Sequence, residues 1–164
     1  MFARYFVELP VEPAQVERAL TRAPQDWLTG MANQANFRGD ALLAEVGFGE
    51  EVRVAREVAI EFGQPVRMAG KTVLPLRWTA TGARGLFPSL EADLEVALLA
   101  ESHTQLAMSA RYVPPLGPIG RMIDRAVLYR VAEATLKDFL DRVGDALVLE
   151  TERIVLRDVV ATAD

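Results

Sequence analysis

The chain has 164 residues, enough for one domain with a substantial buried core, and 51% of them are hydrophobic against 25% charged. A formal net charge of -5 disfavours nucleic acid as a partner, because neutralising phosphates requires a basic surface. The lack of cysteine excludes disulfides and thiolate chemistry, and no apolar run approaches the roughly 18 residues of a membrane-spanning helix, so we expect a cytoplasmic protein without stable membrane insertion.

The N-terminal segment is predicted to form one strand followed by two short helices. Phe2 to Leu9 is rich in aromatic and branched residues and stops at Pro10, which is typical of a strand. Pro13 suits the first turn of a helix that ends near Pro24. A second short helix is expected from Gln25 or Asp26 onward, with a frayed exit over Asn33 to Gly39.

From Asp40 the apolar residues recur at every second position, which predicts an antiparallel meander with one dry face. Pro75 in its middle indicates an edge or a bulge. Including the first strand, we expect six or seven strands. Those of the meander cover Leu42 to Phe48, Val52 to Phe62, Val66 to Met68, Thr72 to Ala80, Leu90 to Leu98 and Leu106 to Tyr112.

A long helix is predicted after the last strand, from near Pro118 or Ile119 to about Leu147. Its second half carries one broad apolar arc, whereas Ile119, Ile123 and Ala126 fall roughly opposite that arc. The helix therefore either changes its packing partner midway or is bent or interrupted near Asp124. Residues 148–164 are left open as a helical extension, an edge strand or a tail.

The order of these elements resembles the SRPBCC, or START/Bet v 1-like, superfamily of helix-grip proteins. The resemblance spans about residues 2 to 147, and its landmarks are Leu76-Arg77-Trp78, Leu86-Phe87-Pro88, Tyr112 to Pro115, Gly117, Gly120 and Asp124. It implies an α+β fold in which a curved antiparallel sheet wraps a long C-terminal helix around a cavity. We therefore expect a single helix-grip domain over residues 1–147 with an extension over residues 148–164.

The candidate ligand-binding residues are the inward-phased side chains of this sheet and the helix that faces it. They are Arg56, Leu74, Leu76, Trp78, Leu94, Leu106, Met108, Tyr112, Ile123 and Val127. Such a lining, mostly apolar with few polar groups, is typical of a pocket for an apolar ligand. The same side chains would also serve simply to fill the space against the final helix. Arg56 lies on the dry side of its strand, where it would either orient a ligand or reach the solvent or an acidic partner.

The leading hypothesis is a non-catalytic protein that binds a hydrophobic small molecule or lipid between the sheet and the helix. A second reading is a polyketide cyclase or aromatase, with Arg56 and Tyr112 assisting proton transfer. A third is an interaction module, including a homodimer, that uses the patch of Ile119, Ile123 and Ala126. We expect no cofactor and no metal, because His103 is the only histidine and the acidic run Glu91, Asp93 and Glu95 alternates into water.

Overall fold

The computed structural model describes residues 2–22, 24–43, 58–80, 89–113 and 125–161. Helices and strands follow one another in the order expected of a strand, two helices, a meander and a long final helix. They are β1 (Phe2–Leu9), α1 (Pro13–Thr21), α2 (Pro24–Leu43), β2 (Val58–Phe62), β3 (Val66–Met68), β4 (Lys71–Ala80), β5 (Ser89–Ala100), β6 (His103–Val113) and α5 (Arg125–Ala161).

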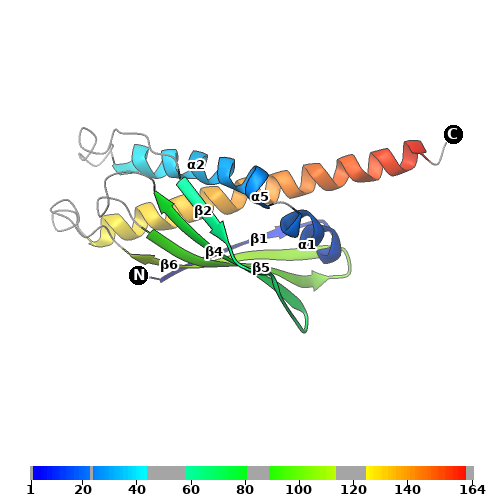
Figure 1. Cartoon of the computed structure of the whole chain (residues 1–164), viewed down its shortest axis with the longest axis horizontal. Coiled ribbons are helices and arrows are strands. Elements are labelled where there is room, and N and C mark those ends of the chain that lie inside the picture. Colours follow the sequence, from blue (N-terminus) through cyan, green and yellow to red (C-terminus); the bar gives the residue numbers. More distant parts are fainter. Residues whose placement is uncertain (1, 23, 44–57, 81–88, 114–124, 162–164) are drawn as a thin grey trace.

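The described strands form one six-stranded antiparallel sheet in the order β1-β6-β5-β4-β2, with β3 pairing to β4 beside β2. The helices lie on one face of this sheet, with α5 along it and α2 beside α5 (Figure 1). We call the helix-covered face the inner face and the opposite face the outer face. None of the helices in the described part of the chain has the length and apolar character needed to cross a bilayer.

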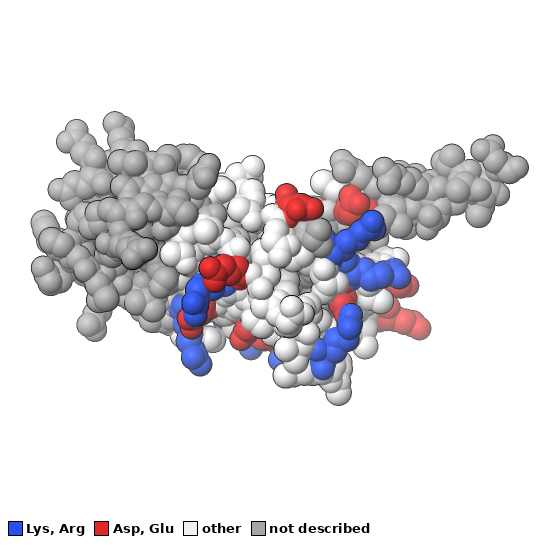
Figure 2. Space-filling view, in the orientation of Figure 1, with Lys and Arg blue, Asp and Glu red and all other residues white. Residues whose placement is uncertain are grey.

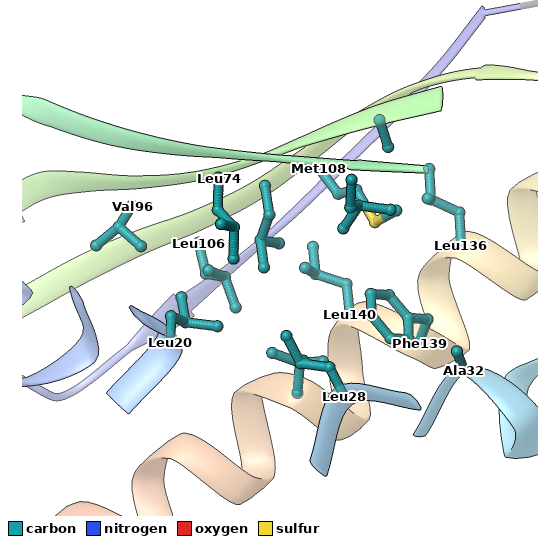
Figure 3. Close-up of a cluster of buried hydrophobic side chains, with 14 of the residues drawn as sticks. Leu20, Leu28, Ala32, Leu74, Val96, Leu106, Met108, Leu136, Phe139 and Leu140 are labelled. Atoms are coloured by element: carbon teal, nitrogen blue, oxygen red, sulfur yellow. The ribbon is translucent and has the colours of Figure 1, made fainter. Parts of the chain in front are cut away.

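The chain has a helix-grip fold, as the resemblance seen in the sequence implied. The prediction from alternation is confirmed along most of β4, β5 and β6, whose even-numbered residues face the helices and are buried. Hydrophobic side chains of the sheet meet those of α1, α2 and α5 in one cluster (Figure 3). Removing this apolar surface from water is the main force that holds the sheet against the helices.

The second helix is longer than predicted, and the predicted start of the meander at Asp40 is therefore wrong. We expected a short helix that frayed over Asn33 to Gly39 and a strand from Asp40, but α2 runs without a break to Leu43. Leu28, Ala32 and Ala35 are buried at helical spacing, and α2 lies against α5. The helical periodicity of this segment was weak, because alanine is only slightly apolar. The helix forms nevertheless, since the packing of its buried side chains outweighs the cost of about 1 kcal/mol for each helical glycine. Residues 44–57, which include the rest of that strand and Val52 and Val54, lie outside the described residues.

The final helix extends well beyond Leu147, where its predicted end lay. Of the three options for residues 148–164, the structure shows a helical extension, and α5 continues to Ala161. No glycine or proline follows Gly144 to end the helix. Its predicted beginning at Pro118 or Ile119, and the bend or interruption near Asp124, lie outside the described residues.

The structure explains the proline within β4 and corrects the expected burial of Leu98 in β5. Pro75 lies opposite the gap between β2 and β3, and its carbonyl accepts a hydrogen bond of 2.8 Å from the Gly63 N–H. In a strand, the nitrogen and the carbonyl of one residue point to the same side. The nitrogen of Pro75 therefore faces the gap between β2 and β3, where no strand needs a hydrogen bond from it. Leu98 was expected to be buried but is 61% exposed; it pairs with Thr104 near the end of β5, just before the pairing of β5 with β6 shifts.

Candidate ligand-binding site

One row of inner-face side chains crosses four strands in register. Ile60 lies opposite Trp78, Trp78 lies opposite Leu90, and Leu90 lies opposite Tyr112. Directly opposite residues of antiparallel strands present their side chains on the same face, so these four form a continuous band. We call it the Trp78–Tyr112 row. It combines an indole, two aliphatic side chains and one phenol.

The Trp78–Tyr112 row retains more exposure than the centre of the inner face. Leu94, Leu106 and Met108 have no exposed surface, whereas Trp78 is 6% and Tyr112 is 8% exposed. Ile60 and Leu90, the other two members of the row, are only partly buried. The row therefore lies slightly nearer to solvent than the centre of the inner face.

The candidate side chains named from the sequence fall into a filled centre and a more exposed row. Leu74, Leu106 and Met108 point toward Phe139 and Leu140 of α5 in the centre of the core (Figure 3). Leu94 lies opposite Leu74 and Met108 in the sheet and belongs to the same buried cluster. Trp78 and Tyr112 belong to the Trp78–Tyr112 row, on either side of Leu90, and are buried but for 6% and 8% of their surface. Leu76 is buried next to Trp78 along β4. That any of them lines a ligand cavity stays a prediction.

The remaining candidates lie on or near the beginning of α5. Val127 is half-buried in its first turn, at the end of the sheet where β1 begins (Figure 1). Arg56 and Ile123 lie outside the described residues, as does Ile119 of the proposed interaction patch. Ala126 of that patch is exposed.

Ile60, Leu90 and Phe139 belong beside the candidate residues but were not among them. Ile60 and Leu90 had the correct alternating phase, but only the register of the sheet places them in one row with Trp78 and Tyr112. Phe139 packs edge-on against Trp78 with ring centroids 5.4 Å apart and planes at 72°. A helical apolar arc identifies Phe139 as core, but it cannot tell which strand residue the ring meets.

Tyr112 is the polar group of the row. Burial raises the pKa of its hydroxyl to about 12, because the phenolate would lose the hydration that stabilises it in water. The hydroxyl therefore stays protonated at neutral pH and can donate a hydrogen bond in apolar surroundings. It could orient one polar atom of an otherwise hydrophobic molecule.

The outer face carries a separate and much more polar groove of about 550 Å³. Its charged lining residues include Glu61, Arg77, Glu91, Asp93 and Arg111, all of them exposed. Arg77 and Glu91 form an ion pair of 2.8 Å across β4 and β5. Over the described face in Figure 2, basic and acidic side chains likewise lie next to one another rather than in fields of one sign. Such exposed, mixed charges contribute little to stability and select for no single ligand charge.

A second groove, of about 570 Å³, lies where α5 passes the beginning of α1. Pro10, Val11 and Val148 give it an apolar floor, and Glu12 and Glu152 lie at its exposed rim. Thr104 is fully buried close to this region, and its hydroxyl donates a hydrogen bond of 2.6 Å to the carbonyl of Val11. That bond ties β6 to the segment between β1 and α1.

Comparison with known proteins finds similarity at the level of the fold. No family model and no curated protein matches the chain. A conserved protein from Geobacillus kaustophilus is 12% identical, with 90% of this chain and 95% of that one aligned at a TM-score of 0.55. The Zhui aromatase/cyclase from Streptomyces sp. R1128 is 12% identical over 90% of this chain and 93% of that one, with a TM-score of 0.43.

An HSP90 activator from Plasmodium falciparum is similar to about the same degree. It is 17% identical over 90% of this chain and 96% of that one, with a TM-score of 0.41. At such identities the likeness concerns the backbone alone, and helix-grip architecture does not by itself define a function. The function must be argued from the residues of this chain.

Proposed function

We propose that the protein binds a hydrophobic small molecule or lipid at the Trp78–Tyr112 row, between β4–β6 and α5. The observation that carries the proposal is the combination of an apolar row in register with its residual exposure, next to a core centre that has none. Ligand sites typically present apolar walls with a few polar groups, and Tyr112 supplies one such group.

The neighbouring inner-face row is made of short side chains where β5, β6 and β1 cross it. Ala92 lies opposite Ala110, and Ala110 lies opposite Ala3. All three are buried, and Ala3 and Ala92 each retain 7% exposure, close to that of Trp78. We propose that a ligand that enters at the Trp78–Tyr112 row extends over these alanines, because their short side chains occupy the least space between the sheet and α5.

Native mass spectrometry of the purified protein is the first test, because a retained ligand would appear as added mass and could be extracted and identified. A titration with a fluorescent long-chain fatty acid follows. Trp27→Phe leaves Trp78 as the single tryptophan, so energy transfer from Trp78 reports that the fatty acid binds, without locating it. An empty protein that also leaves the fatty acid and a lipid panel unbound would refute the proposal.

A pair of alanine variants tests the location. Ala92→Leu places a larger side chain next to the row, and we expect it to weaken fatty-acid binding at least tenfold. Ala97→Leu makes the same change on the outer face of the same strand, so binding should not change. Thermal unfolding of both variants is measured first, so that lost affinity is compared only between folded proteins. Equal affinities would place the ligand elsewhere.

The cyclase-type alternative is favoured by one observation, the position of the Tyr112 phenol in an otherwise apolar row of the inner face. Incubation with a poly-β-ketone thioester analogue separates the two functions. A cyclase converts the analogue to a ring product and loses this activity in Tyr112→Phe, whereas a carrier returns the analogue unchanged. A cytoplasmic location stays a prediction, which cell fractionation would test.

A further inference from the structure

The two edges of the sheet, which we call its borders, are built differently. One border is divided between β2, with five residues, and β3, with three, and α2 lies against β2. The other border is β1, which pairs with β6 over eight consecutive residues without a register shift. Of the described strands only β6 pairs with β1, so alternate residues of β1 turn their N–H and C=O groups away from the sheet.

Long, regular border strands are the ones that recruit another strand, and proteins usually shorten, split or cover them. The β2/β3 border has these protections, whereas β1 has no internal proline and no bulge. Helix α5 contacts β1 only from the inner face: a Cβ on Gly144 would lie 3.3 Å from Val7 Cγ2, and Lys137 Nζ lies 5.1 Å from the Tyr5 ring centroid.

The outer-facing side chains of β1 are unusually apolar for a surface. Phe2 is 60% and Phe6 is 52% exposed, with Arg4 between them and Glu8 after them. Arg4 is 53% exposed and approaches Glu95 only to 4.0 Å. Glu8 is exposed as well, and no described residue forms an ion pair with it. Two aromatic rings and two opposite charges therefore stand along an unpaired border.

We propose that β1 pairs antiparallel with β1 of a second copy of this chain, with Phe6 at the two-fold axis. In that register Arg4 lies opposite the partner's Glu8, Glu8 lies opposite the partner's Arg4, and Phe6 lies opposite the partner's Phe6. Cross-strand pairs of opposite charges and of aromatic rings both stabilise such a ladder. The symmetry makes the Arg4–Glu8 pair occur twice, while the Phe6–Phe6 pair lies on the axis and occurs once, as a two-fold interface requires.

In other registers of the β1–β1 pair, the inner faces of the two sheets also lie on the same side. The charges of the two strands match less well in those registers. Centring the axis on Arg4 places it opposite the partner's Arg4, and centring it on Glu8 places it opposite the partner's Glu8. Centring it on Tyr5 or Val7 leaves Arg4 and Glu8 without an opposite charge. Only the Phe6 register places unlike charges across from each other and sets inner-facing Tyr5 against the partner's Val7, which extends the apolar inner face across both copies.

Charge reversal tests both the interface and its register. We expect the wild-type protein to approach twice its monomer mass as its concentration rises in analytical ultracentrifugation. Arg4→Glu or Glu8→Arg alone places like charges opposite each other and should raise the dissociation constant at least tenfold. An equimolar mixture of the two variants should recover the dimer, because every pair in the mixed species is then of opposite charge.

Glu101→Arg is the matched control, since it makes the same charge change in the turn between β5 and β6 and should leave dimerisation unaltered. Phe6→Ser, at an exposed position, should weaken the dimer at least tenfold while the circular dichroism spectrum stays that of the wild type. A wild-type protein that remains monomeric up to near-millimolar concentration overturns the proposal. So does a dimer that survives both single reversals, or a mixture of the two variants that stays monomeric.

Discussion

The indole of Trp78 in β4 meets the ring of Phe139 in α5 edge to face, with 5.4 Å between the ring centroids. The pair joins the candidate binding row to the core, because Trp78 retains slight exposure and Phe139 has none. The contact therefore fixes α5 over the sheet next to the Trp78–Tyr112 row.

Removing the Phe139 ring should be costly. Phe139→Ala leaves a cavity beside Trp78 and should lower the free energy of unfolding by about 3–5 kcal/mol, while Phe139→Leu keeps most of the volume and should cost about 1–2 kcal/mol. Urea unfolding followed by tryptophan fluorescence measures both. Leu149→Ala, at an exposed position of the same helix, should stay within about 0.5 kcal/mol of wild type.

Gly144 allows α5 to lie close to β1. A Cβ at this position would come within 3.1 Å of Leu9 Cδ2 and 3.3 Å of Val7 Cγ2. Gly144→Val adds a branched side chain to this contact, and we expect it to reduce the free energy of unfolding by about 1–3 kcal/mol in a denaturant titration. Gly30→Val is the comparison, because nothing lies within 4 Å of a Cβ at position 30. A greater loss for Gly30→Val than for Gly144→Val would contradict this account.

The buried hydroxyl of Thr104 holds the carbonyl of Val11. Thr104→Val keeps the shape but leaves that carbonyl without its donor, which should cost about 1–3 kcal/mol of stability. Thr104→Ser retains the hydroxyl and should lose only the effect of one buried methyl group. Hydrogen exchange gives a local readout, since amides at the start of α1 should exchange faster in Thr104→Val than in Thr104→Ser.

Tyr112 should make stability depend on pH in the alkaline range. Its pKa rises from 10.0 to about 12 in the folded protein, so the folded state holds the proton more tightly than the unfolded chain. The contribution is fully present below pH 10 and is lost as the pH rises through about 12. Unfolding titrations across this window should show the decline, and Tyr112→Phe should reduce it. A spectrophotometric titration in which every phenol ionises near pH 10 would argue against this pKa.

Much of the sheet follows from local pattern. Strict alternation along β5 and β6 identifies the strands and their inner faces, because successive side chains of a strand point to opposite sides. Pro10 and Pro13 likewise mark the end of β1 and the beginning of α1. The inner-face members of the candidate site within these strands could thus be named before the fold was known.

Other features could not be predicted because distant residues decide them. We predicted a strand from Asp40, but residues 40–43 continue α2, whose Leu28, Ala32 and Ala35 are buried in the core. Leu98 has the phase of a buried residue and pairs with the buried Thr104, yet it is 61% exposed near the end of β5. Both outcomes depend on partners that a local pattern does not contain.

By itself the sequence determined which residues are apolar at which period, and this was sufficient for the order of most elements and the direction of most side chains. The helix-grip architecture was implied by the resemblance of that order to a known superfamily. Only the tertiary structure decided that Ile60, Trp78, Leu90 and Tyr112 form one row, that Phe139 meets Trp78, and that β1 is a border strand. The physical reason is that periodicity is a property of neighbours along the chain, whereas register, packing and residual exposure arise between segments far apart in sequence.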